Sequence, residues 1–116
     1  MVQTLEWRYH RPGCTSCKRA QEFLVQNGIA DGIVQSATKE PVAGTAALAL
    51  LADATELFVA QGQQVLRFDL TSQRPADEEL LQLLLGRSGK LRAPAFRCGT
   101  RLIVGYNQAL LPTALD

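Results

Sequence analysis

Residues 5–28, LEWRYHRPGCTSCKRAQEFLVQNG, predict a strand, a tight turn and a helix in direct succession. Up to His10, apolar and polar residues alternate with a period of two, which is typical of a strand with one wetter face. The turn falls at residues 11–13, and the following apolar residues recur at helical spacing. Gly28 followed by apolar Ile29 indicates a helix that ends on a left-handed glycine. This order predicts the first unit of an α/β fold.

The middle of the chain is less distinctly patterned. Ile33 and Val34 begin a second strand, and residues 43–53 predict a second helix because they are rich in Ala and Leu. The apolar run within residues 54–62 is too short for its period to separate a helix from a strand. We interpret it as a short helix, and we expect residues 65–70 to be extended or irregular.

The last third of the chain predicts a helix, a hairpin and a final helix. Residues 75–87 begin with a proline suited to the first helical position, carry acidic residues behind it and end on Arg87. Residues 95–104 predict a β-hairpin whose turn contains glycine, and residues 108–111 predict a short helix. The order predicts an α/β sandwich in which the first two strands are parallel and the last two are antiparallel.

Length and composition favour one folded domain over residues 1–116, since the chain is 47% apolar and 20% charged. Twelve Lys and Arg against eleven Asp and Glu leave a net charge of +1, which provides no strong field to attract nucleic acid or anionic lipid. The start lacks a signal-peptide core, and the uncharged run 41–52 is too short to span a bilayer. We therefore expect a cytoplasmic protein without direct nucleic-acid or membrane contacts.

The chain has three cysteines, and two of them form the motif Cys14-Thr15-Ser16-Cys17 between the predicted strand and helix. A thiol at a helix start faces unpaired N–H groups and the positive end of the helix dipole, which favour the thiolate. With Lys18 and Arg19 close by, we expect Cys14 to have a lowered pKa and to be the attacking sulfur. Cys17 lies on the apolar side of the helix and is the expected resolving thiol.

Other interpretations of the pair remain open. One alternative is a zinc site whose ligands would be His10, Cys14, Cys17 and Cys98. Against it, Cys98 has no second cysteine close to it in sequence, and its apolar strand is typical of a small buried hydrophobic residue. An inert pair is a further alternative. We favour a redox-active dithiol with no bound metal, with His10 near the thiols and able to tune them.

The run from Tyr9 to Ala20 resembles the opening of the arsenate reductase (ArsC)/Spx family, thioredoxin-fold proteins related to glutaredoxins, and its C-T-S-C is the Spx-type form. Residues 91–94 and 101–107 resemble the family's "L-x-R-P" strand and "R-L-x-V-G-Y-N" ending, and residues 78–85 match the helix before that proline. The resemblance implies a thioredoxin-like, glutaredoxin/ArsC-type fold, a mixed four-stranded sheet flanked by helices. It also implies a cis Pro94 beside the reactive Cys14, which the residues themselves leave open between cis and trans.

One departure from the family concerns anion binding. The family places Arg immediately before the proline, where it helps to bind an oxyanion, but this chain has Ala93. Arg92, one residue earlier, should point to the opposite side of an extended segment. Arg11 and Arg101 remain as candidate anion contacts, and Arg92 is kept with them among the candidate substrate-binding residues. We expect disulfides to be better substrates than arsenate.

We expect a cytosolic thiol–disulfide oxidoreductase without a bound cofactor, in which Pro94 positions a disulfide substrate or redox protein and glutathione or a thioredoxin-type protein supplies electrons. The first alternative is a non-enzymatic redox-sensing regulator of the Spx type that docks on the RNA polymerase alpha subunit. The second is an arsenate reductase proper.

Overall fold

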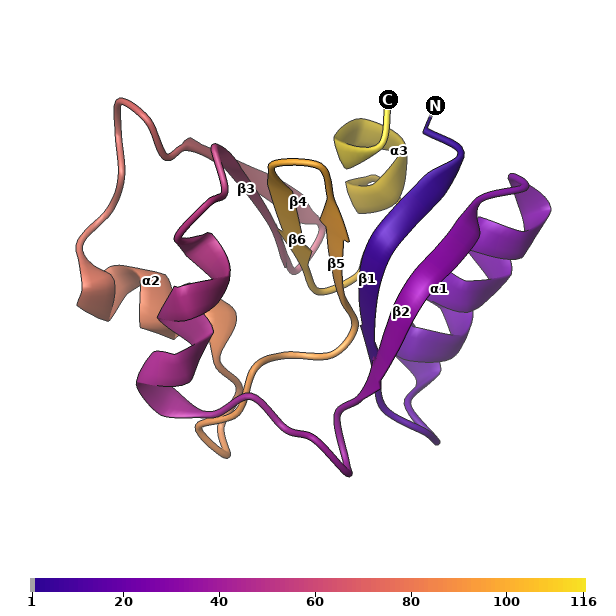
Figure 1. Cartoon of the computed structure of the whole chain (residues 1–116), viewed down its shortest axis with the longest axis horizontal. Helices are drawn as coiled ribbons and strands as arrows, with labels where there is room; N and C mark the ends of the chain where they lie inside the picture. The colour runs from indigo at the N-terminus through magenta and orange to yellow at the C-terminus, as the bar shows by residue number, and fades with distance from the viewer. Residues whose placement is uncertain (1) are drawn as a thin grey trace.

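The computed structural model of the chain describes residues 2–116, which form one mixed sheet with helices on both faces (Figure 1). None of the helices in this range is long and apolar enough to cross a membrane. The elements are, in chain order, β1 (Thr4–His10), α1 (Thr15–Gln26), β2 (Ala30–Ser36), the 3-10 helix η1 (Gly44–Leu51), β3 (Glu56–Gln61), β4 (Gln64–Asp69), α2 (Asp77–Leu84), β5 (Ala95–Cys98), β6 (Arg101–Val104) and α3 (Leu110–Ala114).

The sheet has six strands in the order β2-β1-β5-β6-β3-β4, so the prediction of four strands is wrong. Four of the strands have the predicted pairing: β1 and β2 are parallel, and β5 and β6 form an antiparallel hairpin. Strand β5 joins the two pairs by lying antiparallel to β1. The additional strands β3 and β4 form a second hairpin that extends the sheet beyond β6.

The predicted helix over residues 54–62 is also wrong, because this segment contains β3. Leu57 and Val59 are buried on one face of the sheet, and Phe58 and Ala60 are buried on the other. A strand covered on both faces carries an uninterrupted apolar run. Such a run has no period by which the sequence could separate it from a helix.

The other predicted elements are present with shifted ends. The helix expected over residues 43–53 is η1, and the helix expected over 75–87 is the shorter α2. Helix α2 ends earlier than predicted because Leu85 is already extended and pairs with Leu91, which leaves Arg87 outside the helix. The acidic residues of its first turn are where we predicted them, next to the unpaired N–H groups.

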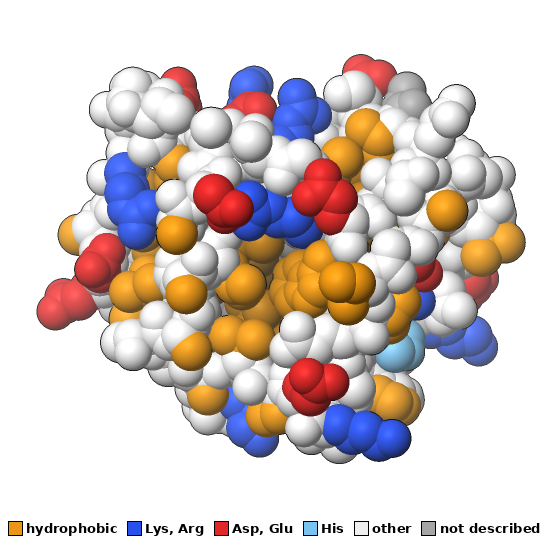
Figure 2. Space-filling view, in the orientation of Figure 1, with side chains coloured by type: hydrophobic (Ala, Val, Ile, Leu, Met, Phe, Trp, Pro, Cys, Tyr) orange, Lys and Arg blue, Asp and Glu red, His pale blue; other side chains and the backbone are white. Residues whose placement is uncertain are grey.

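Two apolar clusters fix the helices to the sheet. Helices α1 and α3 pack on one face, whereas η1 and α2 pack against each other and on the opposite face (Figure 1). The second layer leaves the β2 edge open: Ile33, which pairs with Trp7, is 70% exposed. Figure 2 shows apolar side chains gathered in a hollow near the middle of this face, between the η1–α2 layer and the β1–β2 edge.

The glycine-based end of α1 is confirmed. Gly28 has a φ of 66°, and the Ile29 N–H donates to the Leu24 carbonyl at 2.9 Å. Ile29 is buried against the last turn, as expected for this type of helix end. The C-terminal end of α1 is therefore fixed by a backbone hydrogen bond and by burial of Ile29.

Candidate active site at the start of α1

Cys14 lies in the loop between β1 and α1 and is the N-cap residue of the helix. The loop turns at Gly13, whose φ of 77° lies in the left-handed region that favours glycine. The Cys14 N–H donates to the Arg11 carbonyl at 3.4 Å, and the Lys18 N–H donates to the Cys14 carbonyl at 3.0 Å. Cys14 therefore stands where the N–H groups of the first turn have no partner within the helix.

The two thiols, both free, occupy different environments. The backbone N–H of Cys17 donates to the Cys14 sulfur, with N and Sγ 3.4 Å apart. Cys14 is partly exposed, whereas Cys17 is completely buried beside the apolar residues of α1. An incoming disulfide can therefore approach Cys14 from solvent, and Cys17 lies behind it.

These environments shift the pKa values of the two thiols in opposite directions. Burial acts to raise the pKa of Cys14, but the N–H and thiol of Cys17, together with the hydrogen bond and charge of Arg11, lower that pKa overall. Burial, with a further contribution from Cys14, raises the pKa of Cys17 to about 11. At neutral pH Cys14 therefore has the larger thiolate fraction and is the more reactive of the two thiols.

The cation that lowers the pKa of Cys14 is Arg11, whereas we expected this effect from Lys18 and Arg19. Lys18 borders the thiol, since it lines a shallow pocket of about 300 Å³ with His10 and Cys14. Arg19 is exposed and does not line that pocket. Neighbouring residues of a helix point in different directions, so proximity in sequence to the N-cap does not bring both side chains to the sulfur.

Strand β1 carries a buried charge that the sequence did not predict. Arg8 is only 6% exposed and makes two 3.0 Å hydrogen bonds to the carboxylate of Asp31 on β2. The alternating pattern placed Arg8 on a wetter face. No local signal identifies Asp31 as its partner, because the contact depends on the parallel register of the two strands.

His10 is connected to this ion pair. Arg8 donates from Nη1 to His10 Nδ1 at 3.0 Å, so the neutral ring carries its proton on Nε2. Burial and the charge of Arg8 lower the pKa of His10, against a raising effect of Asp31. His10 thus lines the Cys14 pocket as a neutral ring with an N–H group to donate.

Pro94 lies beside the end of β1, because Ala95, the first residue of β5, pairs with Tyr9. The Ala93–Pro94 peptide bond is cis, the isomer that the resemblance implied. The Pro94 carbonyl accepts the Gly105 N–H at 2.8 Å, which fixes this segment to the end of β6.

Arg92 is held by backbone groups of the η1–α2 layer and the sheet. It donates from Nη2 to the Ala60 carbonyl at 2.8 Å and from Nη1 to the Leu83 carbonyl at 3.3 Å. Its guanidinium packs against the α-carbon of Gly105, where a Cβ would meet Nη2 at 2.7 Å. Through these hydrogen bonds the Arg92 side chain connects β3 to α2.

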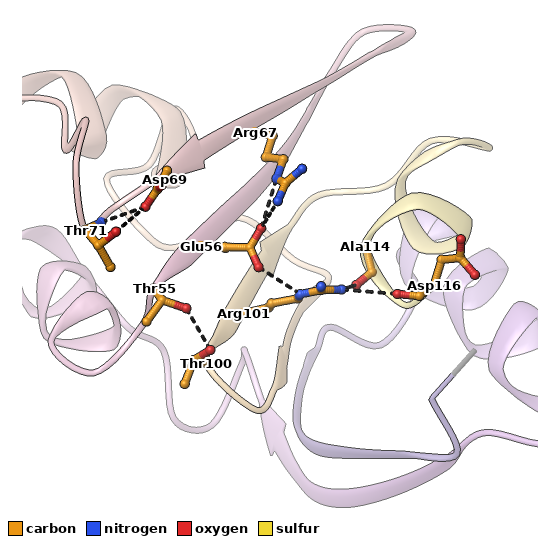
Figure 3. Close-up of polar contacts among 9 residues, drawn as sticks. All are labelled: Thr55, Glu56, Arg67, Asp69, Thr71, Thr100, Arg101, Ala114 and Asp116. Atoms are coloured by element: carbon orange, nitrogen blue, oxygen red, sulfur yellow. Dashed lines mark hydrogen bonds and ion pairs between the residues drawn. The ribbon is translucent and has the colours of Figure 1, made fainter.

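Arg101 is not brought to the cysteines, so its interpretation as an anion contact at that site needs correction. Strand β6 begins at Arg101, which pairs with Cys98, and ends at Val104, which pairs with Ala95. Ala95 in turn pairs with Tyr9 near the cysteine loop, so Arg101 lies at the opposite end of β6 from that loop. The guanidinium binds Glu56 at 3.1 Å and the Ala114 carbonyl at 2.7 Å (Figure 3). Arg101 therefore connects β6 to β3 and to the C-terminal helix.

Cys98 is likewise at the far end of β5. It is partly exposed, not buried as expected, and burial followed by the charge of Glu6 raises its pKa. Across residues 2–116 there is no group of three or more His, Cys, Asp or Glu side chains arranged to hold a metal ion. The zinc set that includes Cys98 is therefore not assembled by this fold.

A second, larger cavity opens next to the cysteine loop. Its volume is about 550 Å³, and it lies between the end of β1, the turn after β2 and the segment before Pro94. Arg11 belongs to both regions, since it lines this cavity and acts on Cys14. The other lining residues are Tyr9, Ala37, Thr38, Gly86, Arg87, Ser88, Lys90, Leu91, Arg92 and Ala93.

The mixed sheet and the helix capped by Cys14 define an α/β protein, and β2-β1-β5-β6 form the four-stranded core that the family resemblance implies. The sequence matches the ArsC family over residues 9–112, and the chain therefore belongs to that family. A search among curated proteins gave no match. Family membership supports a thioredoxin-like oxidoreductase, and the hairpin β3–β4 adds two strands to that core.

Proposed function

We propose that the protein is a cytosolic thiol–disulfide oxidoreductase in which Cys14 attacks and Cys17 resolves. The observation that carries the proposal is the asymmetry of the pair. Cys14 is partly exposed and accepts the Cys17 N–H at 3.4 Å, whereas Cys17 is fully buried with a pKa raised to about 11. Cys14 is thus the accessible sulfur with the lowered pKa, and Cys17 is a protected thiol with a raised pKa.

The reaction proceeds by two exchanges. The Cys14 thiolate attacks one sulfur of a substrate disulfide, forms a mixed disulfide and releases the other sulfur as a thiolate. Cys17 then loses its proton and attacks Cys14 Sγ, which closes the Cys14–Cys17 disulfide and releases the second substrate thiolate. Two electrons pass from the dithiol to the substrate. Glutathione or a thioredoxin-type protein then restores the dithiol and is itself oxidised.

The surrounding residues assist the first exchange. Arg11 stabilises the Cys14 thiolate by a hydrogen bond and by its charge. Pro94, which directly precedes β5, positions an extended substrate segment beside the cysteines. Arsenate fits this site less well than a disulfide, because Ala93 supplies no guanidinium next to Pro94 and Arg101 is bound to Glu56 at the far end of β6.

A trapping experiment tests the proposal. Cys17→Ser protein challenged with glutathione disulfide should accumulate one glutathione adduct, which peptide mass mapping should place on Cys14. Wild-type protein should instead form the Cys14–Cys17 disulfide and release the adduct. The Cys98→Ser/Cys17→Ser protein is the matched control and should be trapped equally well. Absence of an adduct, or an adduct on Cys98 alone, would rule out the proposed roles.

A further inference from the structure

The cavity beside the cysteine loop concentrates positive charge. Four of the twelve Lys and Arg residues of the chain line it, and no Asp or Glu does. In a chain with a net charge of only +1, this is a local excess and not a property of the whole surface. The four are Arg11, Arg87, Lys90 and Arg92.

Two of these cations, Arg87 and Lys90, are free to bind a ligand, and a third, Arg11, is shared with the Cys14 thiol. Arg11, Arg87 and Lys90 are exposed and have no ion-pair partner within residues 2–116, where Arg8, Arg67, Arg74, Arg97 and Arg101 each have one. Arg92 differs because it donates to two backbone carbonyls. A concave wall with one sign of charge focuses the electric field and raises the local concentration of anions.

The cavity has room for an anion larger than a single oxyanion. Its volume of about 550 Å³ lies within the range of roughly 300–1,000 Å³ found for pockets that hold drug-sized organic ligands. A tetrahedral oxyanion fills only the space of a few water molecules, at about 30 Å³ each. Thr38 and Ser88 add hydroxyl donors to the wall. The lining thus suits several carboxylates on one chain.

We propose that this cavity binds an acidic peptide segment adjacent to the disulfide of a protein substrate. The inference rests on the proposed function and names its substrate class. Arg11 lines the cavity and also acts on Cys14, so a segment held there has its disulfide close to the attacking sulfur. The exchange is that given above: Cys14 takes one sulfur, the other leaves as a thiolate, and Cys17 completes the two-electron reduction.

Two synthetic peptide disulfides provide the test. Each is a symmetrical disulfide dimer of a short peptide, and the two differ only in having Glu or Gln at the positions around the cysteine. Single-turnover oxidation of the reduced protein by each dimer is quenched by alkylation and measured by mass spectrometry. At low ionic strength the Glu dimer should react about tenfold faster than the Gln dimer, and added salt should reduce the difference.

Variants locate the effect. The Arg87→Gln/Lys90→Gln protein should lose the preference for the Glu dimer and should react with the Gln dimer within about twofold of wild type. Arg74→Gln removes an exposed cation outside the cavity and should keep the preference. Equal rates for the two dimers with wild-type protein, or an unchanged preference in the double variant, would overturn the assignment.

A binding measurement separates this inference from the proposed function. Cys14→Ser/Cys17→Ser protein is titrated in a calorimeter with a Glu peptide and a Gln peptide in which Ser replaces Cys. Binding of the Glu peptide but not of the Gln peptide supports the cavity assignment. It does so even if wild-type protein fails to reduce the dimers, a result that would contradict only the proposed function. Inorganic phosphate and glutathione disulfide are added as competitors. If either displaces the Glu peptide at a concentration below that of the peptide, the cavity binds a small anion and the inference is overturned.

Discussion

The guanidinium of Arg8 and the carboxylate of Asp31 join the first two strands of the sheet through two hydrogen bonds of 3.0 Å. The Arg8 side chain is 7% exposed and that of Asp31 is 28% exposed, so solvent reaches the pair from the Asp31 side only. Removing one partner of such a pair is costly, because the buried charge that remains cannot recover its hydration.

We predict that Asp31→Asn lowers the free energy of unfolding by about 1–3 kcal/mol, a range reduced from that of a fully buried pair because Asp31 is partly exposed. Urea denaturation measures the change. Asp53→Asn is the matched control: the Asp53 side chain, which pairs with Arg97, is 82% exposed, so its removal should have little effect. Arg8→Met/Asp31→Asn should recover much of the loss, and a double variant as unstable as Asp31→Asn would contradict the argument.

A pH dependence follows from His10. Its pKa in the folded protein is lowered by burial and by Arg8, so the folded state disfavours the protonated ring. This contribution to stability is present above the unfolded value of about 6.5 and is lost as the pH falls through the lower folded value. Urea midpoints should therefore fall on acidification through this range, and His10→Gln should make that decline shallower. An unchanged slope in His10→Gln would show that other groups dominate.

Arg11 should control the reactivity of Cys14. Arg11→Gln removes a hydrogen bond and a charge that lower the pKa of that thiol, so its alkylation by iodoacetamide at neutral pH should slow by roughly threefold or more. Arg19→Gln, which removes another exposed cation in the first turns of α1, should have little effect. If Arg19→Gln slowed the reaction more than Arg11→Gln, the sequence-based assignment would be the better one.

Gly105 should tolerate no side chain. Its φ is 92°, and a Cβ would come within 2.7 Å of Arg92 Nη2. Gly105→Ala should lower the free energy of unfolding by about 2–4 kcal/mol, from backbone strain and displacement of the guanidinium. Gly89→Ala is a matched control with a φ of 77° and open space, so it should cost about 1 kcal/mol. Equal losses, measured by urea denaturation, would exclude the contact with Arg92.

Cys98 should be dispensable for thiol exchange, because it lies at the end of β5 away from the Cys14 loop. Cys98→Ala should retain the single-turnover rate of wild type and lose on the order of 1 kcal/mol of stability through reduced packing. A loss of rate comparable to that of Cys14→Ser would make Cys98 a second resolving thiol.

The sequence by itself determined the local features. The strand, turn and helix of residues 5–28, the glycine that ends α1, the acidic first turn of α2 and the β5–β6 hairpin are all encoded by residues close together along the chain. The placement of Cys14 at a helix start and of Cys17 on its apolar side has the same origin. Capping, periodicity and turn chemistry act over a few residues, so they can be read without knowing the fold.

Only the tertiary structure decided which distant groups meet. The run Leu57-Phe58-Val59 became a strand because both faces of the sheet are covered at that point, a condition set by helices elsewhere in the chain. Strand register and layer packing determine three further features. They are the Arg8–Asp31 pair, the separation of Arg101 from Cys14, and the basic cavity that Arg11 shares with lining residues between Gly86 and Ala93. Such contacts join residues far apart in sequence, where no local propensity or spacing specifies the partner.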